Sequence, residues 1–322
     1  MTIIETPSAA AELLKKQDNI LILVHGHPDG DTLGCGYSLC RALRAMGKKA
    51  NVSCSDEIPH KFDYLLKGID EQAFEPEFIT AVDVADTKLL GKKNEELYKD
   101  RIDLSIDHHP SNKFFAKSTL VDAKAAAASE VVLQVIRELG QEVTPEIANG
   151  IYTGLSTDTG CFRYSNVTPR TLRMAAEMIE AGADNAAINT VMFETKTKSY
   201  AALERECLAN MQMLFDDRCA MITITQDIFD KTGSDESECD GIAALPRQVE
   251  GVLIGITMRE KPDGNFKVSL RTHAPIDASE LCSKMGGGGH ARAAGCQLEG
   301  PLENARKVLM KNLKDFFDSE NE

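Results

Sequence analysis

Three short apolar runs in the first third of this chain each end in acidic or imidazole side chains. The runs cover residues 20–24, 78–82 and 102–106. Runs of this length, separated by segments with helical spacing, are typical of buried parallel strands. The carboxyl ends of parallel strands meet at one edge of a sheet, where α/β proteins form their sites. The pattern therefore predicts an α/β fold whose mainly parallel sheet, flanked by helices, gathers these side chains at one edge.

Six side chains at these strand ends, or just after a later helix, are of types that bind divalent cations. They are His25, Asp29, Asp31, Asp83, His108 and Asp158. Six ligands exceed what one ion takes if it keeps positions open for water and substrate, but they suit two ions that share a carboxylate. Burying four acids together without cations would be prohibitive, so the acids themselves predict bound metal. The alternative for segment 25–31 is a Pro-Asp-Gly turn whose carboxylates accept only from backbone N–H groups.

Helices are predicted where apolar residues recur at helical spacing between capping residues and glycines. These segments are residues 33–46, 123–139, 144–155, 168–179, 201–215 and 301–317. Because the first of them begins at Leu33, we expect Asp29 and Asp31 in the loop before it. Asp158 is expected just past the helix over 144–155. Asp86 is expected to cap a helix rather than to bind metal.

The second half of the chain has a different pattern. Strands are predicted over residues 220–225, 252–259 and 266–271, with a hairpin turn at Pro262-Asp263-Gly264 between the last two. A length of 322 residues corresponds to about two domains. We predict an N-terminal α/β domain over residues 1–185, a connector over 186–205 and a smaller C-terminal α/β domain over 206–322.

Composition excludes several classes of partner. The formal charge of −14, from 36 Lys and Arg against 50 Asp and Glu, disfavours attraction to long duplex DNA or an anionic membrane. No run approaches the ~20 apolar residues of a membrane span, and no secretory signal is visible near the N-terminus. The nine cysteines are dispersed without a C-x-x-C pair, which favours reduced thiols. We therefore expect a cytoplasmic protein.

The ordered set of motifs resembles the DHH phosphoesterases. The resemblance rests on segment 25–31 (HGHPDGD), the strand end at Asp83, the Asp107-His108-His109 triplet and Asp158. Segment 286–295 (GGGGHARAAG) is similar to the DHHA1 domain that follows in one branch of that superfamily. The compact two-domain layout resembles the oligoribonuclease and pAp phosphatase group, often called NrnA-like.

The resemblance implies a role for each candidate ligand. One ion would be held by His25, Asp29 and Asp83, and the other by Asp31, Asp83, His108 and Asp158, with Asp83 bridging. A mixed set of carboxylates and imidazoles favours Mn²⁺, with Mg²⁺ or Co²⁺ as substitutes. Such a pair activates a water that attacks phosphorus in line. Asp107 is expected next to the ligands rather than among them. His109 is expected to contact the phosphate or assist the departing group, or alternatively to orient another ligand.

Substrate-binding candidates lie mainly in the second domain. Arg271 ends a predicted strand, where a guanidinium can grip phosphate through two hydrogen bonds. The glycine run that includes Gly288 and Gly289 offers backbone N–H groups to an anion next to His290, although a glycine run is often only a flexible loop. Arg163 is a further candidate for phosphate, with a surface arginine as the alternative. Two domains joined by a connector imply a cleft that favours short substrates.

The resemblance thus implies a dimetal phosphodiesterase and phosphatase that acts on short oligoribonucleotides (pNpN products) and pAp. The enzyme alternatives are a linear or cyclic dinucleotide phosphodiesterase, a RecJ-like exonuclease and a family II pyrophosphatase. The RecJ-like exonuclease is disfavoured by the negative net charge, and the family II pyrophosphatase by the Gly-Gly-Gly-His segment. A nucleotide-binding regulator without turnover is the alternative from another class. Small nucleotides are the expected partners, and the family resemblance makes a homodimer plausible.

Overall fold

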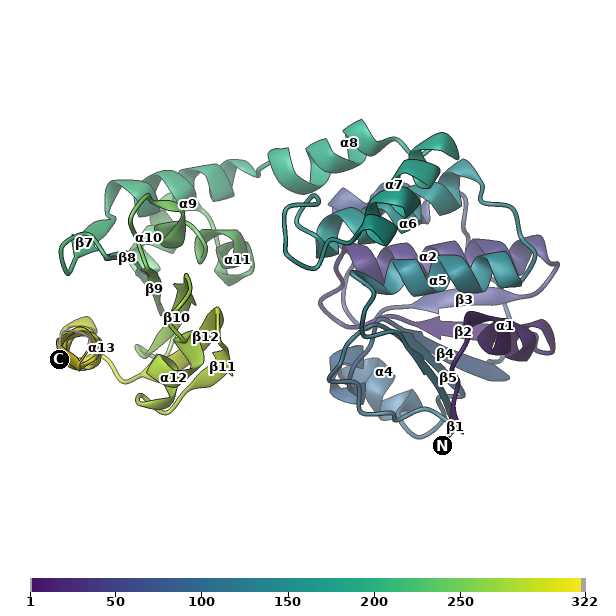
Figure 1. Ribbon diagram of the computed structural model, residues 1–322, viewed down its shortest axis with the longest axis horizontal. Coiled ribbons are helices and arrows are strands. Elements are labelled where there is room, and N and C mark those ends of the chain that lie inside the picture. The colour runs from purple at the N-terminus through teal and green to yellow at the C-terminus, as the bar shows by residue number, and fades with distance from the viewer. Residues whose placement is uncertain (1, 320–322) are drawn as a thin grey trace. The chain divides into compact units, whose positions relative to one another are not determined.

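The chain consists of two compact units that divide between Thr195 and Lys196. The structure is a computed structural model that describes residues 2–319 (Figure 1). The division is surrounded by helical segments. These are α8 (Asn185–Asn189), a π-helical turn (Thr190–Glu194) and α9 (Lys198–Ala209). Each unit contains its own six-stranded sheet and its own apolar core.

The sheet of the first unit is parallel throughout, which confirms the predicted architecture. Its strands are β1 (Thr2–Ile3), β2 (Ile20–Leu23), β3 (Ala50–Ser53), β4 (Phe78–Val82), β5 (Leu104–Asp107) and β6 (Ser118–Val121). The spatial order is β1-β6-β5-β4-β2-β3. The three apolar runs singled out in the sequence therefore form adjacent strands, and their carboxyl ends lie side by side.

Helices cover both faces of this sheet. They are α1 (Pro7–Lys15), α2 (Gly30–Ala45), α3 (Asp63–Leu66), α4 (Gly91–Tyr98), α5 (Ala128–Glu138), α6 (Pro145–Asp158) and α7 (Pro169–Glu180). Figure 1 shows α2 and α5 against one face of the sheet and α4 on the other. Helices α2 and α6 approach so closely that a Cβ at Gly34 would lie 2.2 Å from the carbonyl oxygen of Gly150.

Two ligand candidates lie on helices, not in the loops where the sequence placed them. Helix α2 begins at Gly30 rather than at Leu33, because the Asp29 side chain caps it by accepting from the N–H groups of Asp31 and Thr32. Asp31 therefore occupies the first turn of α2. Asp158 is the last residue of α6, which runs past the predicted end at residue 155.

The second unit contains a mixed sheet in the order β11-β12-β10-β9-β8-β7. Its strands are β7 (Gln212–Leu214), β8 (Cys219–Ile224), β9 (Ile254–Glu260), β10 (Phe266–Thr272), β11 (Gly288–His290) and β12 (Ala293–Leu298). Its helices after α9 are α10 (Gln226–Thr232), α11 (Cys239–Ile242), α12 (Ala278–Ser283) and α13 (Leu302–Ser319). The predicted hairpin is confirmed, since β9 and β10 pair antiparallel around the turn.

The helix predicted over 201–215 was wrong at its C-terminal end. Helix α9 ends at Ala209, and residues 212–214 form β7, which pairs antiparallel with β8. Three consecutive residues with left-handed backbone, Phe215, Asp216 and Asp217, make the turn between these strands. Aspartate tolerates this conformation, so the turn carries no glycine that the sequence would have signalled.

None of the helices within residues 2–319 is sufficiently long and apolar to cross a membrane.

Candidate metal centre

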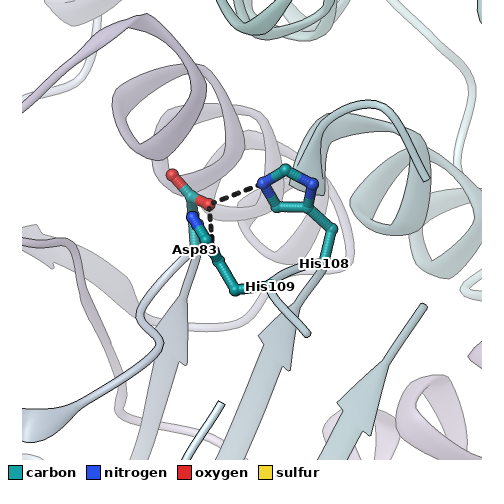
Figure 2. A group of neighbouring side chains, drawn as sticks. All are labelled: Asp83, His108 and His109. Carbon is teal, nitrogen blue, oxygen red and sulfur yellow. Dashed lines mark ion pairs between the residues drawn. The ribbon is translucent and has the colours of Figure 1, made fainter. Parts of the chain in front are cut away.

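Asp83 lies at the middle of the candidate site, directly after β4. Its backbone is left-handed, with φ of 57°, and its N–H donates to the carbonyl oxygen of Ile106 on β5. Its side chain is only 3% exposed. The Oδ1 atom of Asp83 lies 3.6 Å from His108 Nε2 and 3.6 Å from His109 Nδ1 (Figure 2). The ends of two neighbouring strands thus bring a carboxylate and two imidazoles together.

The loop after β2 supplies a second group around the same carboxylate. His25 Nε2 lies 3.5 Å from Asp29 Oδ2 and 3.9 Å from Asp83 Oδ2. The opposite ring nitrogen of His25 is 2.7 Å from the carbonyl oxygen of Gly26, which turns Nε2 toward the acids. One ligand atom from each of His25, Asp29 and Asp83 fits within a cluster 4.8 Å across, which could hold a metal ion.

Asp31, His108 and Asp158 form a further group of the same kind. His108 Nε2 lies 3.2 Å from Asp158 Oδ2. Asp31 is fully buried and accepts from the N–H groups of Ala128, at 2.6 Å, and Ser129, at 3.0 Å, and from the Ser129 hydroxyl. The structure thus brings all six predicted ligands to the carboxyl edge of the sheet.

Burial and like charges make the acids of this centre hard to ionise without cations. Burial, followed by the charge of Asp158, raises the pKa of Asp31 to about 7. Burial and the charges of Asp31, Asp29 and Asp158 raise the pKa of Asp83 well above its ordinary value. For His108, burial disfavours the charged form, but the hydrogen bond to Asp158 and the charge of Asp31 outweigh it and raise its pKa to about 9. In the metal-free site, bound protons therefore offset the negative charge of these acids. A divalent cation would supply that positive charge instead.

A buried atom at this edge supports a metal here. Asp83 Oδ1 is inaccessible to water and accepts no hydrogen bond. Leaving such atoms unpaired costs free energy, and a native structure normally pairs them with a partner or an ion. Carboxylate and imidazole ligands together suit borderline divalent cations. We conclude that this edge is built to hold divalent metal.

Asp107 orients the adjacent histidine. Burial opposes ionisation of Asp107, but hydrogen bonds from His109 and Asn112 outweigh it and lower its pKa. Its Oδ1 lies 2.8 Å from His109 Nδ1, and its Oδ2 accepts from Asn112 at 2.6 Å. Because Nδ1 of His109 donates to this carboxylate, Nε2 is the ring nitrogen left for other partners. Asn112 was not anticipated from the sequence.

A cavity in the second unit joins several of the substrate-binding candidates. It measures about 260 Å³, and Arg271, Gly288 and Gly289 line it together with Arg259 and Lys267. Arg259 and Lys267 were not predicted as candidates from the sequence. Lys267 and Arg271 are four residues apart on β10, and alternate residues of a strand point to the same side. Arg259 lies opposite Lys267 on β9, so all three share one face of the sheet.

The other candidates differ from Arg271 in where the structure places them. Gly288 and Gly289, which line the cavity, belong to β11, paired with β12, so this part of the glycine run is a strand rather than a loop. His290 ends the same strand and is exposed, but it does not line the cavity. Arg163 belongs to the first unit, where its Nε donates to the carbonyl oxygen of Gly160.

Comparison with known proteins identifies both units. The model of the DHH family N-terminal domain matches residues 19–155, and that of the DHHA1 domain matches residues 219–319. A bifunctional oligoribonuclease and PAP phosphatase NrnA of Thermus thermophilus is 34% identical over 95% of this chain and 92% of its own length. The protein of the same description from Bacillus subtilis is 26% identical over 87% of this chain and 90% of its own.

A solved structure of an exopolyphosphatase-related protein from Bacteroides fragilis shares the fold. Its TM-score is 0.86 at 24% identity, and the alignment covers 98% of this chain and 97% of the other. The two domain matches, in their order along the chain, and the full-length similarity to the Thermus protein agree with the ligand set at the sheet edge. The chain therefore belongs to the DHH family, with a DHH domain followed by a DHHA1 domain.

Proposed function

We propose that this protein is a metal-dependent phosphoesterase that hydrolyses short oligoribonucleotides and pAp to mononucleotides. The observation that carries the proposal is Asp83, a buried carboxylate whose Oδ1 accepts no hydrogen bond. It belongs to two groups that could each hold a metal ion, one with His25 and Asp29 and the other with His108 and His109. The names of the Thermus and Bacillus relatives support the choice of substrate.

Two divalent cations, Mn²⁺ in the first place and Mg²⁺ or Co²⁺ as substitutes, are proposed to occupy the centre. His25, Asp29 and Asp83 would hold one, and Asp31, Asp83, His108 and Asp158 the other. When bound, such a pair supplies a water that is deprotonated near neutral pH and offsets the charge of the phosphoryl oxygens. The mixed carboxylate and imidazole set supports this choice of ions.

His109 is proposed to act on the substrate through Nε2. The ionised Asp107 accepts from Nδ1 of His109 and fixes the orientation of the ring, which leaves Nε2 for a phosphoryl oxygen or the departing oxygen. Asp107 acts through His109 and is a positioning residue.

The DHHA1 domain is proposed to bind the phosphate of the substrate. Arg271 and Lys267 give the cavity beside Gly288 and Gly289 a cationic lining, which favours a phosphate group. Arg259, on the same face, forms an ion pair with Glu236. His290 and Arg163 remain proposed contacts whose positions outside the cavity call for a test of their own.

Hydrolysis of a substrate panel tests the proposal. The panel contains pApA, pAp, a cyclic dinucleotide, a 5-mer RNA and bis-p-nitrophenyl phosphate, each with Mn²⁺ and with chelator. We expect Mn²⁺-dependent turnover of pApA and pAp that falls with increasing length of RNA. Equal rates at every length would contradict the preference for short substrates, and nucleotide binding without any turnover would favour a regulator.

Asp83→Asn is the matched variant for the centre. It is expected to abolish turnover and metal binding with the fold retained, because no hydrogen bond of the Asp83 side chain is lost. Asp86→Asn is the control, since Asp86 lies on the same segment but only caps a turn by accepting from Lys88 N–H, which Asn also does. An active Asp83→Asn variant would contradict the shared-carboxylate assignment.

A further inference from the structure

A cavity of about 480 Å³ adjoins the metal centre and lies within the first unit. One side of it consists of the centre itself, with His25, Asp29, Asp83, His109 and Asp158. Other lining residues come from the segment after β4 and belong to no metal group. They are Lys88, Leu89, Gly91 and Lys92, which we call the lysine wall. His27 and Asp56, 3.1 Å apart, also line the cavity.

The lysine wall is fixed to the loop that carries the ligands. The N–H of Gly26 donates to the carbonyl oxygen of Leu89 at 2.7 Å, and the Ser55 hydroxyl donates to the carbonyl oxygen of Leu90 at 2.6 Å. Gly91 has φ of 75°, and a Cβ there would lie 2.6 Å from the Ser55 side chain, so only glycine allows this close approach. The backbone that presents the two lysines is therefore held beside the metal centre.

The side chains of the wall have the chemistry of a nucleotide site. Lys88 and Lys92 are exposed and form no ion pair with any side chain that the structure describes. Leu89 lies between them in sequence and is 47% exposed. The apolar side chain of Leu89 can pack against a nucleotide base. The two ammonium groups beside it can bind a phosphate. The acids nearby belong to the metal groups or, like Asp56, pair with a histidine.

Lys92 lies at the N-terminus of helix α4, where a positive charge does not stabilise the helix. Lys92 and Lys93 occupy the first turn of α4, which contains no acidic residue, and among the N–H groups of this turn that of Asn94 donates to the Ser55 hydroxyl. Cations at a helix N-terminus oppose the helix dipole, whereas an anion there is stabilised by it. Asp83, whose buried Oδ1 accepts no hydrogen bond, lines the same cavity. The cavity thus offers a metal centre and a cationic wall to one ligand.

We propose that the lysine wall is a subsite for the nucleotide next to the phosphate being cleaved, with Leu89 against its base and Lys88 and Lys92 binding the adjoining phosphate. The inference rests on the proposed function and deepens it, because it assigns recognition of a second phosphate to the DHH domain. A volume of about 480 Å³ is in the range of small-ligand pockets. Recognition of this kind favours substrates that carry a phosphate beyond the scissile one.

The test compares Lys88→Gln/Lys92→Gln with Lys93→Gln, in the full-length protein with Mn²⁺. Lys93 is the matched control because it lies in the same helical turn but does not line the cavity. One substrate is a 5′-phosphorylated RNA trinucleotide, which has a phosphate on both sides of its first linkage. The other is bis-p-nitrophenyl phosphate, which has no further phosphate.

For the trinucleotide, the double variant is expected to raise KM about tenfold with kcat unchanged, because exposed charge contacts contribute modestly and uniformly to binding. For bis-p-nitrophenyl phosphate, kcat/KM is expected to stay within about twofold of the unmodified protein, which shows that the centre and the fold are intact. The slope of log(kcat/KM) for the trinucleotide against log salt is expected to fall by about 0.7, the value for one lost phosphate contact on a single strand.

Three outcomes overturn the subsite. The first is a trinucleotide KM no higher in the double variant than in Lys93→Gln, and the second is an unchanged salt slope. The third is an equal loss of activity on both substrates, which would place the lysines in the centre or the fold. If the unmodified protein does not hydrolyse the trinucleotide at all, the proposed function fails, and that result is distinct from hydrolysis with an unchanged KM.

Discussion

The metal-free first unit is expected to lose stability as pH rises from about 4 to 9. Asp31 has a folded-state pKa of about 7, above its ordinary value of 3.8. Between these values the folded protein holds a proton that the unfolded chain releases, so the free energy of unfolding falls with rising pH. His108, with a pKa raised from 6.5 to about 9, stabilises the fold below pH 6.5 and loses that contribution as pH rises to 9.

The size of the effect follows from these values. Each tenfold change in proton affinity corresponds to about 1.4 kcal/mol, so the rise in the pKa of Asp31 corresponds to about 4 kcal/mol. The pKa of Asp31 and that of His108 each depend on the charge of the other group, so their contributions to the free energy of unfolding do not add. We therefore use only the contribution of Asp31, which is the larger. For a domain of this size, about 4 kcal/mol corresponds to a decrease of about 10 °C in Tm. Asp29 and Asp107, whose pKa values are lowered, act below pH 4 and leave this window unaffected.

Differential scanning calorimetry of the chelator-treated protein from pH 4 to 8.5 measures this decrease, provided the transitions of the two units are resolved. Protein loaded with Mn²⁺ is expected to behave oppositely, because metal binding requires ionised carboxylates and neutral imidazoles and strengthens with pH. Asp158→Asn removes one cause of both raised pKa values and is expected to reduce the pH dependence, whereas the part of the Asp31 shift that comes from burial remains. A metal-free first unit whose Tm stays constant or rises over this range would refute the reasoning.

Three further predictions concern packing, a buried ion pair and substrate binding. Gly34→Ala places a methyl group against the carbonyl oxygen of Gly150 and is expected to lower the free energy of unfolding by about 1–3 kcal/mol in urea titrations; an unchanged value would contradict the close packing of α2 on α6. Glu130→Gln weakens the contact of a fully buried carboxylate with Arg170 and is expected to cost about 2 kcal/mol in the same titrations, with Glu138→Gln on the same helix as the exposed control. Arg271→Gln is expected to raise KM for pApA about tenfold while turnover of bis-p-nitrophenyl phosphate is unchanged, and a parallel loss on both substrates would argue against a phosphate contact.

The clustering of the candidate ligands at one sheet edge could be predicted from the sequence, because most of the motif residues follow apolar strands. Strand β4 runs over Phe78–Val82 as predicted, and the position of Asp83 after it follows from the parallel sheet. The start of α2 was misplaced because the capping role of Asp29 was not assigned, and that cap brings Asp31 onto the helix. Asp86 was assigned correctly, since it caps the turn after β4.

Contacts made by backbone groups and by distant strands could not be predicted. The helix predicted from residue 123 begins instead at Ala128, whose N–H donates to Asp31, and the carbonyl oxygen of Ala125 before it faces His108. Nothing in the side chains of an alanine run signals this role. Arg259 and Lys267 join Arg271 only through the pairing of β9 with β10, which the separate strands do not specify.

The alanine run just before α5 holds two ligands of the centre at once. The carbonyl oxygen of Ala125 lies 3.2 Å from His108 Nδ1, and the N–H of Ala128 donates to Asp31 at 2.6 Å. Because these bonds come from the main chain, many small replacements in the run would preserve them, whereas adding or deleting one residue would displace both ligands together. Because residues 125–128 are buried, this stretch should accept only residues as small as glycine or serine in a mutational library, and it should reject changes of length.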